Sequence, residues 1–186
     1  DITTLAPHKR VGLGLVRTFQ INQLFGTLTP LQSLALAVSS RVDAARRWWQ
    51  PMGADAAVAA ECEALLAQFR LQDHADQPTR ELPYGKRRLL EIALAVALKP
   101  TVLLLDEPAA GVPAGERADI LATVATLPSD VSVMLIEHDM DLVFSFATRL
   151  TVLVNGAVLT EGTPQEIASD ARVKAVYLGE AEFNHG

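Results

Sequence analysis

The amino-acid sequence predicts an α/β fold in which a wound parallel sheet carries a separate helical subdomain. Two observations lead to this prediction. Residues 101–162 alternate between short apolar runs and segments with helical spacing, and residues 30–98 contain three helical segments in succession. Nearly continuous runs of Val, Ile and Leu are typical of parallel strands that are covered on both faces.

The first elements of the chain are expected to be a strand and three helices. The segment GLGLVRTFQ, residues 12–20, has the length and apolar content of a short strand. A helix follows the Thr29-Pro30 start, and a second helix, rich in Ala and Leu, is expected from about residue 54 to residue 69. The third covers KRRLLEIALAVAL, residues 86–98, with its apolar side chains on one face. These three helices form the predicted subdomain.

The second half of the chain alternates strands and helices. TVLLL and VSVMLIE are expected to be strands, and AGERADILATVATL and MDLVFSFAT are expected to be helices. In TVLVNGAVLTE, the pair Asn155-Gly156 between two apolar runs is the strongest short signal for a hairpin. TPQE, residues 163–166, is a capping box with Pro in the first helical turn.

Composition limits the classes of function. The chain has 186 residues, of which 49% are hydrophobic, so it can bury a proper core. Its 22 acidic residues outnumber 16 basic ones, and the net charge of −6 argues against a broad electrostatic grip on nucleic acid. Cys62 is the only cysteine, which excludes an internal disulfide and favours a reducing compartment such as the cytoplasm. No apolar run approaches the roughly 18 residues of a membrane span.

Two acidic side chains, Asp106 and Glu107, directly follow the apolar run TVLLL. A buried carboxylate costs several kcal/mol unless a cation or hydrogen-bond donors replace its hydration. Ligands of open parallel sheets bind beyond the carboxyl ends of the strands, where His138 follows the next predicted strand. Two acids and an imidazole at one edge suit phosphoryl transfer with Mg²⁺. The alternatives are solvated acids at the surface and a structural histidine.

The third predicted helix opens with Lys86, Arg87 and Arg88, although cations are unfavourable near the positive end of a helix dipole. This arrangement is favourable if the helix end receives a polyanion, with the backbone N–H groups after Gly85 directed at phosphate oxygens. The alternative is that the three side chains extend into water. The segment is not a phosphate-binding loop, because that motif requires Gly where Arg80 stands and Ser or Thr where Arg87 stands.

Taken together, these motifs resemble the ATP-binding subunit of an ABC transporter. Four motifs occur in the order typical of that family: TFQ resembles the Q-loop, LPYGKRRLLEIA the signature region, VLLLDEP the Walker B strand, and LIEHD the segment with the switch histidine. The sequence segments RTFQ, LDEPAAGV and VYLGE are most similar to those of subunits that power uptake of branched-chain or other hydrophobic amino acids, amides or urea.

The resemblance implies a P-loop NTPase fold with a RecA-like core and an inserted helical subdomain, without the N-terminal Walker A portion. Four parts are expected: the end of an N-terminal β subdomain with the Q-loop (1–22), the helical signature subdomain (23–98), the α/β core with Walker B and the switch histidine (99–168), and a C-terminal tail (169–186).

The resemblance also implies roles for four residues and two small molecules, ATP and Mg²⁺. Gln20 would bind Mg²⁺ and the attacking water, and would link the site to the membrane subunits. Asp106 would hold the Mg²⁺ shell and Glu107 would act on the water. His138 would contact the γ-phosphate of ATP.

The partners implied by the resemblance are a second ATP-binding subunit, arranged head to tail, and integral membrane permease subunits. Tyr84, Gly85 and Lys86 would lie near the nucleotide bound by the opposite subunit. A groove between the Q-loop and the three helices would receive a short helix of the permease. A periplasmic solute-binding protein would be an indirect partner, nucleic acid would not be one, and the chain would lie at the cytoplasmic face of the bacterial plasma membrane.

Three departures from the family pattern affect these expectations. Pro83 replaces the usual Ser of the signature, and AAGVPAGE contains no Asp after Walker B. The Walker A loop and the aromatic residue that stacks on adenine are absent, so we expect a fragment or a truncated subunit that does not hold ATP tightly by itself. An alternative is a non-hydrolytic module that only docks on a partner, although the four site residues argue against it. A soluble ABC protein of DNA repair or translation is disfavoured by the acidic balance.

Overall fold

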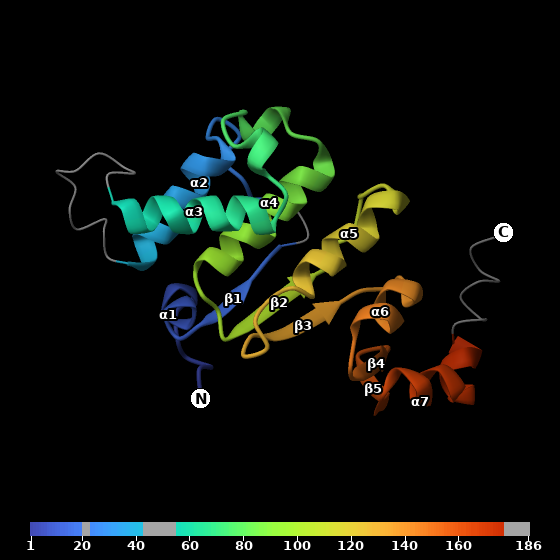
Figure 1. The fold of residues 1–186 in the computed structure, drawn as a ribbon. Coiled ribbons are helices and arrows are strands. Elements are labelled where there is room, and N and C mark those ends of the chain that lie inside the picture. Colours follow the sequence, from blue (N-terminus) through green and yellow to red (C-terminus); the bar gives the residue numbers. More distant parts are fainter. Residues whose placement is uncertain (20–22, 43–54, 177–186) are drawn as a thin grey trace. The chain divides into compact units, whose positions relative to one another are not determined.

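The structure, a computed structural model, describes residues 1–19, 23–42 and 55–176. The chain divides after His138 into two compact units, which are described separately. Figure 1 shows the elements of the first unit. They are α1 (Pro7–Gly12), β1 (Leu15–Arg17), α2 (Pro30–Arg41), α3 (Ala56–Gln68), α4 (Tyr84–Ala97), β2 (Val102–Asp106), α5 (Ala114–Val124) and β3 (Ser132–Ile136), with short 3-10 turns at Gln72–His74 and Thr79–Glu81.

The sheet of the first unit is parallel, with strand order β1-β2-β3. The central strand β2 pairs on one side with β1, where Val16 lies opposite Leu103, and on the other side with β3, where Asp106 lies opposite Ile136. Crossovers through helices join the strands, as parallel pairing requires. The predicted parallel α/β sheet is therefore confirmed.

The two faces of this sheet differ in burial. Val16, Leu103 and Leu105 are at most 4% exposed, and α4 and α5 lie along one side of the sheet (Figure 1). Alternate residues of a strand point to opposite faces, and on β3 the residues Met134 and Ile136 are 62% and 57% exposed. The prediction that this strand is covered on both faces is wrong for the described part of the first unit, where both residues are more than half exposed.

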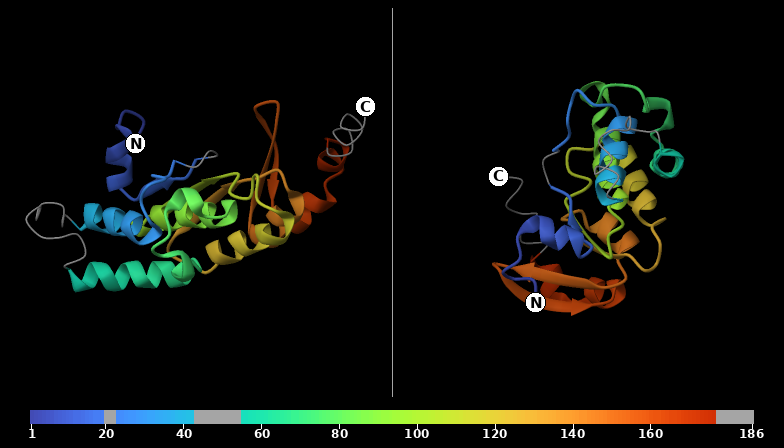
Figure 2. Two further views of the ribbon diagram at one scale, coloured as in Figure 1. Left: turned by 90° about the horizontal axis from the view of Figure 1, so that it is seen from above. Right: turned by 90° about the vertical axis from the view of Figure 1, so that its left-hand side faces the viewer.

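The three predicted helices pack together as one group. Figure 2 shows α2 beside α3 and α4, and the largest sets of helix contacts in the first unit join these elements. Their shared core includes Leu34, Val38, Leu90 and Ile92, none of which is exposed to solvent. Cys62 on α3 is 1% exposed, as expected for a packing residue, and burial raises the pKa of its thiol.

Helix α2 begins with a complete capping box. The Thr29 hydroxyl accepts a hydrogen bond from Gln32 N at 3.2 Å, and the Gln32 side chain accepts one from Thr29 N at 3.0 Å. These bonds satisfy two backbone donors that the first turn would otherwise leave unpaired.

Replacing the cap should destabilise the folded state. We expect Thr29→Ala to lower the free energy of unfolding by about 1 kcal/mol, whereas Thr29→Ser keeps the acceptor and most of the stability. Urea denaturation of the two variants beside the parent checks this. Equal stability of the alanine variant and the parent would show that the capping box contributes nothing.

The second unit contains α6 (Met140–Phe146), β4 (Leu150–Val154), β5 (Ala157–Gly162) and α7 (Pro164–Ser169). β4 and β5 form the predicted antiparallel hairpin, and the positive φ values of Asn155 (51°) and Gly156 (78°) are those of a type I′ turn. The predicted capping box is present at Thr163 and Glu166. None of the helices in the described residues is both long enough and apolar enough to cross a bilayer.

Candidate functional site

The carboxyl end of β2 places Asp106 beside the strand that leads toward Gln20. Asp106 Oδ2 accepts a hydrogen bond from Arg17 Nη2 at 3.1 Å, and the Arg17 guanidinium also lies 5.3 Å from the centre of the Phe19 ring. The Arg17 side chain is 56% exposed, so water screens this ion pair and it adds little to stability. Asp106 thus pairs with a largely exposed cation rather than a buried one.

Glu107 adopts a left-handed backbone conformation, with φ of 45°. This region costs a residue with a side chain roughly 1–2 kcal/mol. The surrounding backbone holds the turn, because Glu107 N donates to Ile136 O at 2.9 Å and Ala110 N donates to Glu107 O at 3.1 Å. The turn ends β2 at Asp106 and interrupts the alternation of side chains along the strand. Strained residues of this kind occur often at functional sites.

His138 lies beside Glu107 at the end of the neighbouring strand. Its Nδ1 is 3.5 Å from Glu107 Oε1, and its side chain is 76% exposed. The register of the parallel strands explains this proximity, because Asp106 pairs with Ile136 and the residues that follow each strand emerge at the same edge. An accessible imidazole beside a carboxylate can hold a proton or donate a hydrogen bond to an anion.

Glu137 joins the two loops at this edge, a role that the sequence did not suggest. Its side chain is 2% exposed, Oε1 accepts a hydrogen bond from Ala109 N at 3.0 Å, and Oε2 accepts one from His138 N at 3.3 Å. The acidic residue directly before His138 in LIEHD was the available signal. Glu137 therefore fixes the loop after β2 against the end of β3.

The first turn of α4 carries three residues predicted to lie near a nucleotide: Tyr84, Gly85 and Lys86. A Cβ at Gly111, whose φ is 71°, would come within 3.3 Å of the Tyr84 ring, so the loop after β2 packs against this turn. Lys86 Nζ donates to Arg70 O at 2.8 Å. Helix α4 begins at Tyr84, two residues before the predicted start, and its N-cap residue Pro83 makes no side-chain cap hydrogen bond.

Arg88 is not directed at solvent or at a polyanion. It is fully buried, Nε donates to Pro108 O at 3.0 Å, and Nη2 donates to Asp106 O at 2.8 Å and to Glu107 O at 2.9 Å. Nη1 donates to Glu91 Oε2 at 2.6 Å. The expectation that all three bases face a ligand is wrong for Arg88, because a buried guanidinium must find acceptors within the protein.

The Arg88–Glu91 pair also binds the backbone of Phe19, in the segment that follows β1. Glu91 Oε1 accepts a hydrogen bond from Phe19 N at 3.1 Å, and Arg88 Nη1 donates to Phe19 O. Gln20, the next residue, lies outside the described residues. The structure therefore brings Asp106, Glu107 and His138 to one edge and holds the backbone before Gln20 beside them, while the signature residues lie on α4.

The described side chains could hold Mg²⁺ only together with another ligand. Within the described part of the chain, no group of three or more His, Cys, Asp or Glu side chains is placed to hold a metal ion by itself. Mg²⁺ in nucleotide sites is usually bound by one or two carboxylates, water and substrate phosphates. A single carboxylate such as Asp106 at an exposed sheet edge fits that kind of site.

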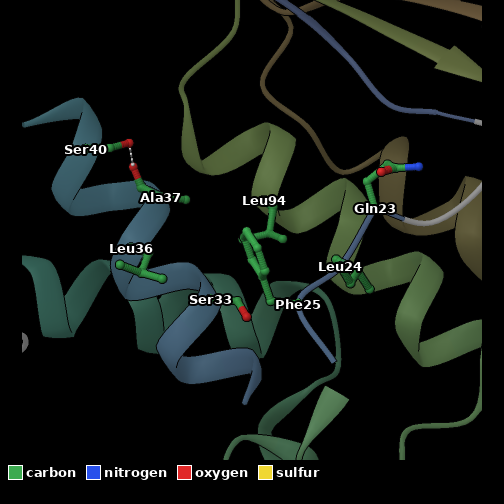
Figure 3. A pocket seen from close by; sticks show the side chains of 8 residues that line it. All are labelled: Gln23, Leu24, Phe25, Ser33, Leu36, Ala37, Ser40 and Leu94. Atoms are coloured by element: carbon green, nitrogen blue, oxygen red, sulfur yellow. Dashed lines mark hydrogen bonds between the residues drawn. The ribbon is translucent and has the colours of Figure 1, made fainter. Parts of the chain in front are cut away.

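A second feature of the first unit is an apolar cleft between α2, α4 and the segment before α2. It has a volume of about 290 Å³, and Figure 3 shows its lining. The lining residues are Gln23, Leu24, Phe25, Ser33, Leu36, Ala37, Ser40 and Leu94. Phe25 is 73% exposed and Leu36 is 40% exposed, so the cleft presents apolar side chains to its surroundings.

Comparison with known proteins identifies the family. The ABC transporter family matches residues 2–110, more than half of the chain, and a branched-chain amino acid ATP-binding cassette transporter family matches residues 157–182. The high-affinity branched-chain amino acid transport ATP-binding protein BraF of Pseudomonas aeruginosa is 38% identical, over 97% of this chain and 74% of BraF. The chain belongs to the ABC transporter ATP-binding family. The corresponding LivG protein of Escherichia coli is 34% identical, over 91% of this chain and 69% of LivG.

Solved structures of ABC ATP-binding cassettes share this fold. One cassette of an ABC transporter superposes with a TM-score of 0.77 at 28% identity, covering 95% of this chain and 73% of that one. A structure of a cassette in its ADP conformation gives a TM-score of 0.76 at 28% identity, over 96% of this chain and 74% of that one. The predictions of the ABC family, the P-loop NTPase fold and an ABC-type ATPase subunit are confirmed. ABC ATP-binding domains bind nucleotide and work with membrane permease subunits.

Proposed function

We propose that this chain is the ATP-hydrolysing subunit of an importer for branched-chain or other hydrophobic amino acids, and that ATP hydrolysis drives uptake. The observation that carries this proposal is the approach of Glu107 to His138, at 3.5 Å, directly after Asp106 at the end of the central strand. The names of BraF and LivG, both branched-chain amino acid transport proteins, support this solute class.

Each residue of the site has a distinct task in this proposal. Mg²⁺, when bound with ATP, neutralises charge on the phosphate oxygens. Asp106 would hold the metal ion in place of its exposed partner Arg17. Glu107 accepts a proton from the attacking water or orients it, and His138 donates a hydrogen bond to the γ-phosphate. Gln20 positions the same water and senses the membrane subunits.

The signature residues act on the nucleotide of the opposite subunit. Two copies pair head to tail, so that the start of α4 faces the triphosphate held by the partner. The backbone N–H groups of the first turn supply donors to the phosphates, which favour the positive end of a helix. Because Pro83 has no hydroxyl, these donors and Lys86 carry the contact. The left-handed Gly111 and the Tyr84 ring keep this turn close to the loop after Glu107.

The apolar cleft is the proposed docking site of the permease. Phe25, Leu36 and Leu94 form an apolar surface that a short amphipathic helix can fill. The first lining residue of the cleft, Gln23, follows Gln20 by three positions in the chain. Only a very short segment of this chain therefore links Gln20 of the hydrolytic site to the residues that would contact a permease helix. In this proposal the chain works at the cytoplasmic face of the bacterial plasma membrane, and a periplasmic binding protein delivers the solute on the other side.

Uptake by cells tests the solute class. We expect deletion of the gene for the full chain to abolish saturable uptake of labelled leucine, isoleucine or valine, and the parent gene to restore it. Restoration of amide or urea uptake alone would overturn the choice of solute. Restoration of leucine uptake by a chain carrying Glu107→Gln would favour the alternative of a docking module that does not hydrolyse ATP.

Gln20 should separate hydrolysis from transport. We expect Gln20→Ala in the full chain to leave part of the basal ATP hydrolysis but to abolish amino acid uptake, because the residue links the site to the membrane subunits. Parallel measurements of phosphate release and uptake in proteoliposomes check this. An equal loss of both activities would contradict the coupling role.

A further inference from the structure

One buried charged pair of the first unit takes no part in the chemistry proposed above. Arg88 and Glu91 lie on α4, and their side chains are 1% and 9% exposed. Each nitrogen of the Arg88 guanidinium donates to a protein acceptor, through the bonds to Glu91, to Phe19 and to the loop after β2. A buried ion pair is costly unless its hydrogen bonds are satisfied, and it is weak evidence for stability alone.

The guanidinium holds three successive carbonyl groups at the end of the central strand. Its Nη2 bonds the carbonyls of Asp106 and Glu107, and its Nε bonds that of Pro108. Three carbonyls converge on one side chain only if the chain turns sharply, and Glu107 has the left-handed φ of 45° that makes this turn. Arg88 therefore supports the strained conformation from which the Glu107 side chain leaves the backbone.

The carboxylate of Glu91 completes the arrangement. One oxygen holds Arg88 at 2.6 Å, and the other accepts the Phe19 N–H at 3.1 Å. Because Arg88 also bonds the Phe19 carbonyl, both backbone polar groups of that residue are fixed by the pair. The backbone that precedes Gln20 is thus bound by both side chains, and the same Arg88 binds the backbone of Glu107.

We propose that Arg88, oriented by Glu91, is a positioning residue for ATP hydrolysis. It fixes the left-handed turn at Glu107, so that the Glu107 side chain meets the attacking water, and together with Glu91 it fixes the backbone of Phe19 in the same arrangement. The inference rests on the proposed ATPase function. It assigns no contact between Arg88 and ATP, so it requires an effect on the rate of the chemical step and not on nucleotide binding.

The test measures steady-state ATP hydrolysis by the full chain. Each rate is divided by the number of nucleotide-binding sites, which is determined by titration with a fluorescent ATP analogue. Arg88→Met keeps the length of the side chain but removes its donors, and we expect kcat per site to fall about 100-fold. We expect KM for ATP to change by less than about threefold. Arg88→Lys retains a charge and some donors, so its kcat should exceed that of the methionine variant about tenfold.

Arg41→Met is the matched control. Arg41 also pairs with a glutamate, Glu61, at 2.6 Å and donates to the carbonyl of Ala97 at the far end of α4. Within the described residues, none of these bonds reaches the loop after β2. Its replacement should lower the yield or stability of folded protein without changing kcat per titrated site. The comparison separates a loss of folded protein from a loss of positioning.

The outcomes distinguish this inference from the proposed function. If the parent hydrolyses ATP and Arg88→Met does so at a similar rate per site, or if KM rises while kcat is retained, the positioning role is overturned. An equally slow lysine variant would also contradict it. If Arg88→Met does not fold, Glu91→Gln decides, with an expected fall in kcat of about tenfold; a rate equal to that of the parent overturns the inference. A parent that does not hydrolyse ATP refutes the proposed function itself.

Discussion

Glu107→Gln in the full chain should reduce kcat for ATP hydrolysis by a factor of about 10³ while nucleotide binding persists. The amide has nearly the same shape as the carboxylate but cannot accept a proton from water, and general-base catalysis contributes a factor of roughly 10²–10⁴. The left-handed turn and its support by backbone hydrogen bonds do not depend on the side-chain charge, so the site should keep its geometry. Phosphate release and binding of a fluorescent ATP analogue measure the two properties.

Glu63→Gln is the control for this change, because Glu63 is an exposed glutamate on α3. It should leave kcat and nucleotide affinity at the values of the parent. The substituted site should also trap bound ATP, so the head-to-tail pair should become more persistent in Glu107→Gln when Mg²⁺ and ATP are present. Turnover retained by Glu107→Gln would exclude Glu107 as the residue that acts on water.

Phe25→Asp should prevent the chain from associating with its permease. Phe25 is 73% exposed and lines the apolar cleft, so its replacement costs little folding free energy but places a carboxylate where an apolar helix would dock. Loss of one central aromatic anchor typically costs an interface about 2 kcal/mol or more. We expect at least a tenfold loss of chain co-purified with permease-containing membranes, together with loss of amino acid uptake.

Leu13→Asp is a matched control for the cleft substitution. Leu13 is 62% exposed and lies after α1, outside the cleft, so it tests whether any new acid on the surface has the same effect. Membrane association of Leu13→Asp should match that of the parent. If Phe25→Asp associates as well as Leu13→Asp, the cleft is not the permease site.

Elements defined by local signals could be predicted from the sequence. Asn155-Gly156 specified the hairpin turn because few residues accept two successive positive φ angles, and Thr163 with Glu166 specified a cap through side chains three residues apart. The approach of Glu107 to His138 was also predictable, because both follow apolar runs that pair as parallel strands.

The environment of Arg88 could not be predicted in this way. In KRR at the start of an amphipathic helix, nothing local distinguishes a base that extends into water from one that binds three carbonyls. That choice depends on the loop after β2, which is 18 to 20 residues away in the chain and adopts its turn only when the sheet is formed. The left-handed conformation of Glu107 is equally a product of tertiary packing, since glutamate has no local preference for it.

A crystal structure of the full chain carrying Glu107→Gln, grown with ATP and Mn²⁺ in place of Mg²⁺, would test the proposed site most directly. The anomalous signal of Mn²⁺ locates the metal independently of the protein. We expect the metal beside the Asp106 carboxylate, and the γ-phosphate within hydrogen-bond distance, about 3 Å, of the His138 ring. A triphosphate bound away from Asp106, residue 107 and His138 would contradict the proposed hydrolytic site.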